Sequence, residues 1–349
     1  MPSEQSHDTS VSTAGELAID ARNVHVTYAD GTEAVQGVDL QVESGEFFGF
    51  LGPNGAGKTT TIKTFATLLH PTTGTVLVNG YDVETKSTAV CESIGYMAQE
   101  TSVDEELTAR ENIRFASKVY GVPSDERADR VEQLLDLVNL TDVADTRAEN
   151  FSGGMKKRLD AATVLVHRPP IVFLDEPTTG LDPEARIAFW EYLRRINELG
   201  TTVFLTTQYL EEVDRLCDRI GLLQDGQIVT TDTPESLKSS IGGEILELQL
   251  EEPSANRMDH AKRAIRQSDV LDDSTVETTE TTLRVRAAEV RENASALLVS
   301  LHEAGITVTG FEVHSPTLDD VFLELTGSEA VTAEDETETP AVDQQEVAR

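Results

Sequence analysis

Residues 52–60 read GPNGAGKTT, and this stretch decides the fold of the chain. The apolar run FFGFL precedes it and a helix-like segment, TTIKTFATLL, continues from it. Glycines in such a loop leave backbone N–H groups free to converge on phosphate, and a helix N-terminus adds partial positive charge. Lys58 can neutralise phosphate, and the Thr59 hydroxyl can ligate Mg²⁺. The loop predicts binding of a nucleoside triphosphate, but alone it identifies no particular ATPase or GTPase.

A second motif lies at residues 171–176, IVFLDE, where an apolar run ends in two carboxylates. Taken alone, such a run is more often a plain strand and turn. In a parallel sheet, however, its end would lie beside the phosphate loop. Asp175 could then hold Mg²⁺, usually through water, while Glu176 faces the γ-phosphate. A carboxylate next to the metal ligand is the expected base for an attacking water.

Between these motifs lies FSGGM, residues 151–155, followed by the basic start of a helix, KKRLDAATVLV. Ser152 can donate to a phosphate oxygen, and Gly153 and Gly154 expose N–H groups at a helix N-terminus, which makes a second anion site. A lone S-G-G is usually a flexible turn, so its meaning depends on the other two motifs. Two phosphate-facing elements in one chain predict a nucleotide held between two subunits.

Residues 151–155 resemble the signature loop of ABC-type ATPases, and Leu181 with Asp182, after PTTG, resembles the D-loop of that family. In the family, the signature loop of one subunit caps the ATP held by the other subunit's cradle. The resemblance therefore implies a head-to-tail homodimer, or a heterodimer with a similar ATPase, closed by two ATP molecules.

Three further positions match the family. Tyr28, in the strand-like VHVTY, matches the aromatic that stacks on adenine, although a half-buried strand tyrosine is the plainer interpretation. Gln99, in IGYMAQE, matches the glutamine that touches Mg²⁺ and the attacking water. Gln208 stands where most of the family has histidine, and it cannot become cationic. The segment TTQYLEE nevertheless resembles the daunorubicin-resistance branch of export ATPases, where glutamine is usual, so we expect an active ATPase.

The resemblance assigns ATP and Mg²⁺ as cofactors and gives each matched position a role. Catalysis is assigned to Glu176, Gln208, Gln99 and Lys58. Metal binding is assigned to Thr59, Gln99 and Asp175. Nucleotide binding is assigned to Tyr28, Gly52, Pro53, Asn54, Gly55, Ala56, Gly57, Lys58, Thr59, Thr60, Ser152, Gly153, Gly154, Met155 and Asp182.

The composition is strongly acidic, with a formal net charge of −35 over 349 residues. The charge is spread along the chain, so an acidic tail does not explain it. At molar salt the Debye length falls to about 3 Å, which screens self-repulsion while carboxylates keep the protein hydrated. We therefore predict a halophile's cytoplasm as the setting. A protein that is acidic for partner recognition would show a local acidic patch instead. Binding to nucleic acid is disfavoured because phosphates would be repelled.

Other features bear on location and cofactors. Cys91 and Cys217 show no metal spacing and read as small core residues in a reducing compartment. The N-terminal stretch lacks the regions of a signal peptide, and no apolar run is long enough to span a bilayer. We expect a cytoplasmic subunit, peripheral to the membrane through a separate ABC-2-like permease. The histidines of the C-terminal part, His260, His302 and His314, are too scattered to predict zinc.

The predicted fold class is α/β, a P-loop NTPase with an ABC-type core, antiparallel β and helical subdomains, and a small C-terminal α+β ferredoxin-like domain. The nucleotide-binding domain is expected at 17–240, with its helical subdomain at about 100–150. The order βαββαβ is expected at 243–327. It ends in SPTLDDVFLELTG, where Thr317 and Asp320 are spaced as a capping box, and this segment resembles the C-terminal extension of drug-export ATPases. Residues 1–16 and the acidic stretch 328–349 are expected to be disordered.

These observations predict the ATP-binding and hydrolysing subunit of an ABC-type exporter, which powers a separate permease through ATP-driven dimerisation. The alternative is a soluble ABC-type ATPase that acts on DNA or ribosomes. Repair ATPases separate the phosphate loop from the Asp-Glu strand by a long coiled coil, and no heptads lie between Lys58 and Asp175 here. Translation-associated members usually carry two sets of motifs. A non-hydrolysing sensor would lack the Glu176 carboxylate.

Overall fold

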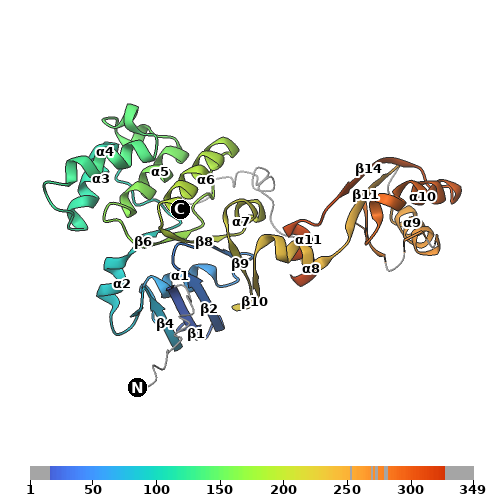
Figure 1. Ribbon diagram of the computed structural model, residues 1–349, viewed down its shortest axis with the longest axis horizontal. Helices are drawn as coiled ribbons and strands as arrows, with labels where there is room; N and C mark the ends of the chain where they lie inside the picture. Colours follow the sequence, from blue (N-terminus) through green and yellow to red (C-terminus); the bar gives the residue numbers. More distant parts are fainter. Residues whose placement is uncertain (1–15, 252–253, 269, 272–273, 279–281, 327–349) are drawn as a thin grey trace, which may run out of the picture. The chain divides into compact units, whose positions relative to one another are not determined.

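The computed structural model describes residues 16–251, 254–268, 270–271, 274–278 and 282–326. It divides into two compact units, one that extends to Thr231 and one that begins at Asp232 (Figure 1). The two tails that the sequence predicts as disordered lie outside the described residues, except for Glu16.

The first unit is built on a six-stranded sheet. Its strands, in spatial order, are β10 (Gln227–Asp232), β9 (Arg219–Gln224), β3 (Phe47–Leu51), β8 (Thr202–Thr207), β7 (Ile171–Asp175) and β6 (Ile94–Met97). β3 pairs in parallel with both β8 and β9, and β7 pairs in parallel with β8 and β6. Every residue of β3 and β7 is buried, as expected for strands covered on both faces. The carboxyl ends of β3, β7 and β8 therefore meet at one edge, where the phosphate loop begins.

A second sheet of the same unit has four strands in the order β2 (Glu33–Glu43), β1 (Leu17–Thr27), β4 (Thr73–Val78) and β5 (Tyr81–Asp82). β1 pairs antiparallel with both β2 and β4. One apolar cluster joins this sheet to the six-stranded sheet and to α1 (Lys58–Phe65). At its centre, the Phe204 ring contacts the rings of Phe48, Phe65 and Phe173 at centroid distances of 5.5 to 5.7 Å. These contacts fix the helix that starts at the phosphate loop.

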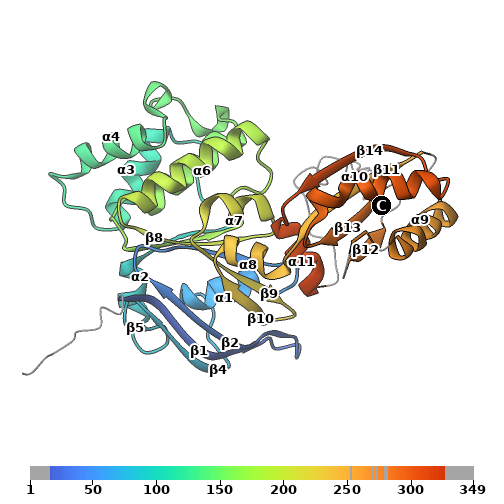
Figure 2. The same cartoon turned by 45° about the vertical axis from the view of Figure 1, so that its right-hand side comes forward.

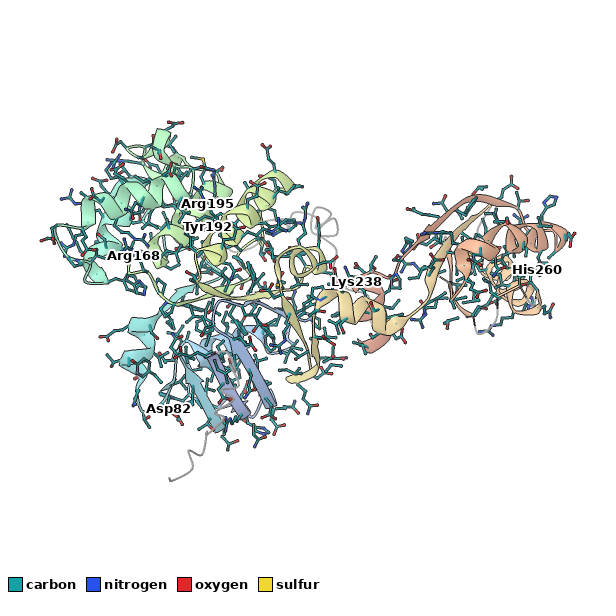
Figure 3. All side chains as sticks on the ribbon, viewed as in Figure 1. Asp82, Arg168, Tyr192, Arg195, Lys238 and His260 are labelled. Atoms are coloured by element: carbon teal, nitrogen blue, oxygen red, sulfur yellow. The ribbon has the colours of Figure 1, made fainter. Side chains whose placement is uncertain are left out.

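Helices cover both faces of the six-stranded sheet. Figure 1 shows α1 and the four-stranded sheet on one side, with α5 (Gly153–Val164), α6 (Pro183–Glu198) and α7 (Leu210–Leu216) on the other, and Figure 2 shows the same placement for α1, α6 and α7. Side chains fill the space between these layers (Figure 3), and Tyr192 of α6 is 4% exposed. The helices that begin at the phosphate loop, after Ser152 and after Asp182 therefore all belong to this unit.

The predicted helical segment contains α3 (Ala109–Val119) and α4 (Arg127–Leu137), which pack against each other and against α5. A capping box starts α3, since the Thr108 side chain accepts from the Glu111 N–H while the Glu111 carboxylate accepts from the Thr108 N–H. The shorter α2 (Ser87–Ser93) leads into β6.

The second unit has the predicted order βαββαβ. Its elements are α8 (Pro234–Ile241), β11 (Glu244–Leu250), α9 (Ala255–Gln267), β12 (Thr275–Thr278), β13 (Thr282–Ala287), α10 (Val290–Glu303), β14 (Val308–His314) and α11 (Leu318–Thr326). The sheet order is β12-β13-β11-β14, and Leu246, Leu283 and Leu297 form part of a separate core. At the start of α11, Asp320 N donates to the Thr317 hydroxyl, as the predicted capping box requires. The predicted fold class is confirmed.

One sequence prediction is wrong at a single residue. Cys91 is exposed, whereas Cys217 is buried as expected. Cys91 lies on α2, where only Val90 is buried, so the helix turns the thiol away from the core, and its sulfur lies 3.1 Å from the Thr67 hydroxyl. Within the described ranges, no helix is long and apolar enough to cross a membrane.

Candidate nucleotide-binding site

The phosphate loop connects the end of β3 to α1. Two of its glycines are required by close approach of the backbone. A Cβ at Gly52 would lie 2.4 Å from the Leu223 carbonyl oxygen, and one at Gly57 would lie 2.3 Å from the Ala34 carbonyl oxygen. Gly57 also has φ 105°, a region that side chains rarely adopt. The loop therefore folds as a backbone-lined cradle in which neither position accepts a side chain.

Lys58 begins α1 and is 4% exposed. Its ammonium donates to the carbonyl oxygens of Gly52 at 2.7 Å and Pro53 at 3.1 Å, and it forms an ion pair with Glu176 Oε1 at 3.1 Å. Burial lowers the pKa of Lys58, and the nearby Glu176 and Asp175 carboxylates oppose that shift. The lysine of the cradle and the carboxylate at the strand end are thus in direct contact.

Asp175 ends β7 and is 1% exposed. Its Oδ1 accepts from the Thr59 hydroxyl at 3.1 Å and from the Thr206 hydroxyl at 2.7 Å. The fold has brought the start of α1 and the ends of β7 and β8 to one point. Carboxylate and hydroxyl oxygens are the donors that Mg²⁺ prefers, so this set fits such an ion.

Glu176 follows Asp175 with φ 46°, an unusual value for a residue other than glycine. Its N–H donates to the Thr206 carbonyl oxygen at 3.0 Å, which holds this conformation. Its Oε2 accepts from Gln99 Nε2 at 3.2 Å. Strained backbone costs about 1 to 3 kcal/mol and is concentrated at functional sites. Lys58 therefore holds one carboxylate oxygen of Glu176, Oε1, and Gln99 holds the other, Oε2.

Two further predicted residues lie near this cluster. Gln208 directly follows β8 and is 7% exposed, so it lies at the edge where Thr206 contacts Asp175. Tyr28 directly follows β1 and is 41% exposed. The Tyr28 hydroxyl lies 3.0 Å from the Thr60 hydroxyl on α1. An exposed ring is thereby anchored beside the cradle.

The signature loop and Asp182 form a second cluster. Ser152 caps α5, since its hydroxyl accepts from the Met155 N–H at 3.3 Å, and Asp182 caps α6 by accepting from the Ala185 N–H at 2.9 Å. A Cβ at Gly154 would lie 2.7 Å from the Ala185 Cβ, so only glycine lets the two helix starts approach this closely. Ser152 and Gly153 are exposed, unlike the buried cradle residues Lys58 and Asp175.

The segment after Gln99 is held by a set of contacts that the sequence did not predict. The Lys157 ammonium on α5 donates to the Gln99 carbonyl oxygen at 2.6 Å, and the Ser102 hydroxyl donates to Asp160 Oδ1 at 2.5 Å. Burial lowers the pKa of Lys157. The only local signal was the basic run KKR after the signature loop, which does not indicate its partner.

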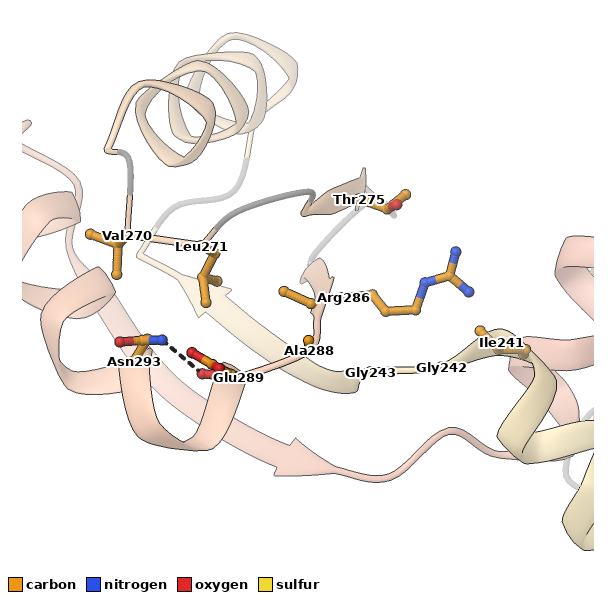
Figure 4. A pocket seen from close by; sticks show the side chains of 11 residues that line it. Ile241, Gly242, Gly243, Val270, Leu271, Thr275, Arg286, Ala288, Glu289 and Asn293 are labelled. Atoms are coloured by element: carbon orange, nitrogen blue, oxygen red, sulfur yellow. Dashed lines mark hydrogen bonds between the residues drawn. The ribbon is translucent and has the colours of Figure 1, made fainter.

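A cavity of about 520 Å³ lies in the second unit (Figure 4). Val270, Leu271, Arg286 and Asn293 are among its lining residues, and the Asn293 side chain donates to the Glu289 carbonyl oxygen of its own helix at 3.1 Å. No nucleophile paired with a base lines this cavity among the residues described. Figure 3 labels His260 on α9, while His302 lies on α10. The cradle in the first unit thus remains the candidate site.

The first unit is a P-loop nucleoside triphosphatase, because its cradle lysine pairs with the carboxylate that directly follows β7, a parallel strand of the same sheet. Residues 35–179 match the family model described as ABC transporter. Residues 233–326 match the model described as ATP-binding protein DrrA1-3-like, C-terminal domain. The two matches lie in the first and second units, respectively.

Curated relatives cover nearly the whole chain. It is 38% identical to the daunorubicin resistance ATP-binding protein DrrA3 of Streptomyces coeruleorubidus, over 90% of this chain and 97% of the relative. It is 36% identical to the linearmycin resistance ATP-binding protein LnrL of Bacillus subtilis, over 88% of this chain and 98% of the relative.

Solved structures of ATP-binding subunits align with less than two thirds of this chain. An ATP-binding subunit of an ABC transporter aligns with TM-score 0.58 and 28% identity, over 64% of this chain and 93% of that one. The ATP-binding cassette MJ0796, in a dimeric post-hydrolysis state with ADP and Pi, aligns with TM-score 0.56 and 27% identity, over 62% of this chain and 98% of that one.

The chain belongs to the ATP-binding proteins of the ABC transporter family, and within it resembles the daunorubicin-resistance group over 90% of its length. It is an ATPase that powers transport by a separate permease, as the sequence predicts.

Proposed function

We propose that this chain is the ATPase of an exporter and works as a head-to-tail pair on two MgATP molecules, with either a second copy or a similar ATPase. The observation that carries the proposal is the separation of two anion-facing clusters. The cradle, with Lys58 and Glu176, is buried, whereas Ser152 and Gly153 are exposed at the start of α5. An exposed helix N-terminus can take a phosphate brought by another subunit.

Nucleotide binding involves the cradle and Tyr28. The exposed Tyr28 ring stacks on adenine, while its hydroxyl bond to Thr60 keeps it beside the phosphates. The backbone of residues 52–57 and the Lys58 ammonium receive the β- and γ-phosphates. Ser152, Gly153, Gly154, Met155 and Asp182 of the other subunit complete the site.

Mg²⁺ fits the oxygen donors of Thr59 and Asp175, with Gln99 as a further contact. When bound, the ion neutralises charge that develops on the phosphates during transfer. Asp175 is already oriented for this role by the Thr206 hydroxyl.

Hydrolysis depends on freeing Glu176 from Lys58. The γ-phosphate competes for the Lys58 ammonium, so ATP entry breaks the ion pair that now occupies Glu176 Oε1. Glu176 can then accept a proton from the attacking water. Gln99, which already donates to Oε2 of Glu176, helps to orient this water. Gln208 donates a hydrogen bond to the γ-phosphate without contributing a charge.

Direction and setting follow from the relatives and the composition. The relatives are named for daunorubicin or linearmycin resistance, so we propose export, through an ABC-2-like permease at the cytoplasmic face of the membrane. The net charge of −35 supports a halophile's cytoplasm and opposes binding to nucleic acid.

The test compares wild type with Glu176→Gln in MgATP hydrolysis, with light scattering to follow assembly, at about 0.1 M and about 2 M KCl. We expect the wild type to hydrolyse ATP and the variant to lose about 100-fold or more in kcat while ATP traps it as a dimer. Ser152→Ala serves as the matched probe of the second cluster and should weaken the trapped dimer. A variant that retains wild-type kcat would refute the role of Glu176, and a monomer that hydrolyses ATP at full rate would refute the paired site.

A further inference from the structure

A buried carboxyl group beside the site has no role in the chemistry above. Glu212 lies in the first turn of α7 and is 0% exposed. Its Oε1 accepts from the indole N–H of Trp190 at 3.0 Å, and Trp190 is itself 3% exposed. Burial raises the pKa of Glu212, and the groups that oppose the rise are Thr207, Trp190, Thr178 and Arg186. Burying an acid is costly unless its partners are held in place.

The partners of Glu212 belong to the two segments that frame the proposed γ-phosphate position. Thr207 is the last residue of β8 and directly precedes Gln208. Thr178 lies on the turn between Glu176 and Asp182. Both side chains lie close enough to the Glu212 carboxyl to favour its ionised form, so this carboxyl is sensitive to the position of both segments.

Arg186 joins the same two segments a second time. It lies in the first turn of α6 and is 7% exposed. Its guanidinium carbon lies 4.9 Å from the ring centroid of Tyr209, the residue that directly follows Gln208 in the sequence. Its Nη2 donates to the carbonyl oxygen of Leu181, directly before Asp182, at 3.4 Å. Arg186 therefore links the residue that follows Gln208 to the residue that precedes Asp182.

We propose that Glu212 is a positioning residue that fixes Gln208 relative to the turn carrying Glu176 and Asp182. This inference rests on the proposed function, because Gln208 and Asp182 act on ATP only there. Through Trp190 the carboxyl is anchored to α6, so movement of the turn and of Gln208 is linked within one buried network.

The carboxyl group is specific for this task. Its two oxygens only accept when it is ionised, and Arg186 favours that form. In Glu212→Gln the side-chain volume and an acceptor for the Trp190 N–H remain, but the negative charge near Arg186 is lost. The variant thus changes the network without creating a cavity.

The experiment measures steady-state ATP hydrolysis by the full chain carrying Glu212→Gln. The matched control is Glu211→Gln, an adjacent carboxylate on the same helix whose side chain is 65% exposed and pairs with Arg215 at 3.7 Å. We expect kcat to fall about tenfold or more in Glu212→Gln, with KM for ATP within about threefold of wild type. The cradle and Tyr28 bind ATP independently of Glu212, so a loss of kcat alone reports positioning. The control should retain both constants.

Trp190 provides an optical readout, because it is the single tryptophan of the chain. Its N–H bond to Glu212 should make indole emission respond to ATP in wild type and in Glu211→Gln. That response should be lost in Glu212→Gln. A purely structural role would lower thermal stability but would not remove the ATP response of a folded variant.

The outcomes are distinct. Wild-type kcat and an intact ATP response in Glu212→Gln would overturn the inference and leave the proposed function standing. A wild type that binds no ATP would overturn the proposed function itself and, with it, this inference. If Glu212→Gln does not fold, Trp190→Phe removes the donor while keeping an aromatic ring. Reduced kcat with unchanged KM in that variant supports the inference, and wild-type kcat overturns it.

Discussion

At the residue scale, the ion pair between Lys58 and Glu176 is the central feature of the nucleotide-free site. The two charged groups are 4% and 9% exposed, and their atoms lie 3.1 Å apart. Removing one partner of such a buried pair leaves an uncompensated charge, which is strongly destabilising. Under the proposed mechanism, phosphate must compete for Lys58 before Glu176 Oε1 is released to act on water.

Also at this scale, we predict that Gly57→Ala destabilises the protein and abolishes ATP binding. Both Gly57 and Gly31 have positive φ, 105° and 88°, so alanine costs about 1 to 2 kcal/mol at either position. Only at Gly57 would the new Cβ also meet a backbone oxygen, that of Ala34, at 2.3 Å. Gly31→Ala, with nothing within 4 Å, is the matched control. Urea unfolding and ATP binding provide the measurements, and equal effects in the two variants would contradict the steric argument.

At the element scale, α5 does more than present the signature loop. Its first turns hold the segment that follows Gln99, through Lys157 to the Gln99 carbonyl and through Asp160 to Ser102. α3, which follows this segment, also packs against α5. Gln99 is therefore positioned by α5, a helix that lies far from Gln99 in the sequence.

For this element we predict that Lys157→Met lowers kcat by about three- to tenfold, because the Gln99 backbone loses its anchor while the Gln99 side chain is retained. Lys156→Met is the matched control. It removes the same charge one residue earlier, where the ammonium pairs with Glu105 at 2.5 Å rather than with Gln99. A partly exposed pair of this kind contributes about 1 kcal/mol or less, so the control should keep its activity. Equal kcat values for the two variants would show that the bond to Gln99 has no effect on hydrolysis.

At the scale of the whole molecule, each unit has a hydrophobic core of its own. The residues with assigned roles in ATP chemistry all lie in the first unit. The second unit contributes a core of its own between its sheet and helices α9 and α10, and the described residues contain no group of side chains that could hold a metal ion.

The net charge of −35 leads to a prediction for the whole chain. We expect the midpoint of thermal unfolding to rise between about 0.1 M and about 2 M KCl, because the Debye length falls from about 10 Å to below about 3 Å and self-repulsion is screened. Circular dichroism measures the midpoint. Since both units are acidic, a midpoint that is unchanged or lower at high salt would contradict the halophile proposal.

The local features of this protein were predictable from its sequence. The cradle, the Asp-Glu strand end and the capping box at Thr317 each depend on residues within one short segment, where backbone geometry and side-chain chemistry act together. The order of strands and helices in the second unit followed from periodicity for the same reason. The wrong placement of Cys91 arose because a small apolar residue in a short helix carries no information about which side of the helix is covered.

The tertiary structure decided which distant residues meet. Thr59 and Asp175, Lys58 and Glu176, Gln99 and Lys157 touch only because parallel strands end at one edge of the sheet and α5 packs beside them. The contact of Glu212 with Trp190 likewise needs α6 and α7 to pack side by side. A sequence motif names the groups available for chemistry, whereas their distances, burial and pKa depend on neighbours supplied by other segments of the chain. For that reason the sequence determined the fold class and the chemical repertoire, and the packing of α5, α6 and α7 against the sheet decided how those groups are held.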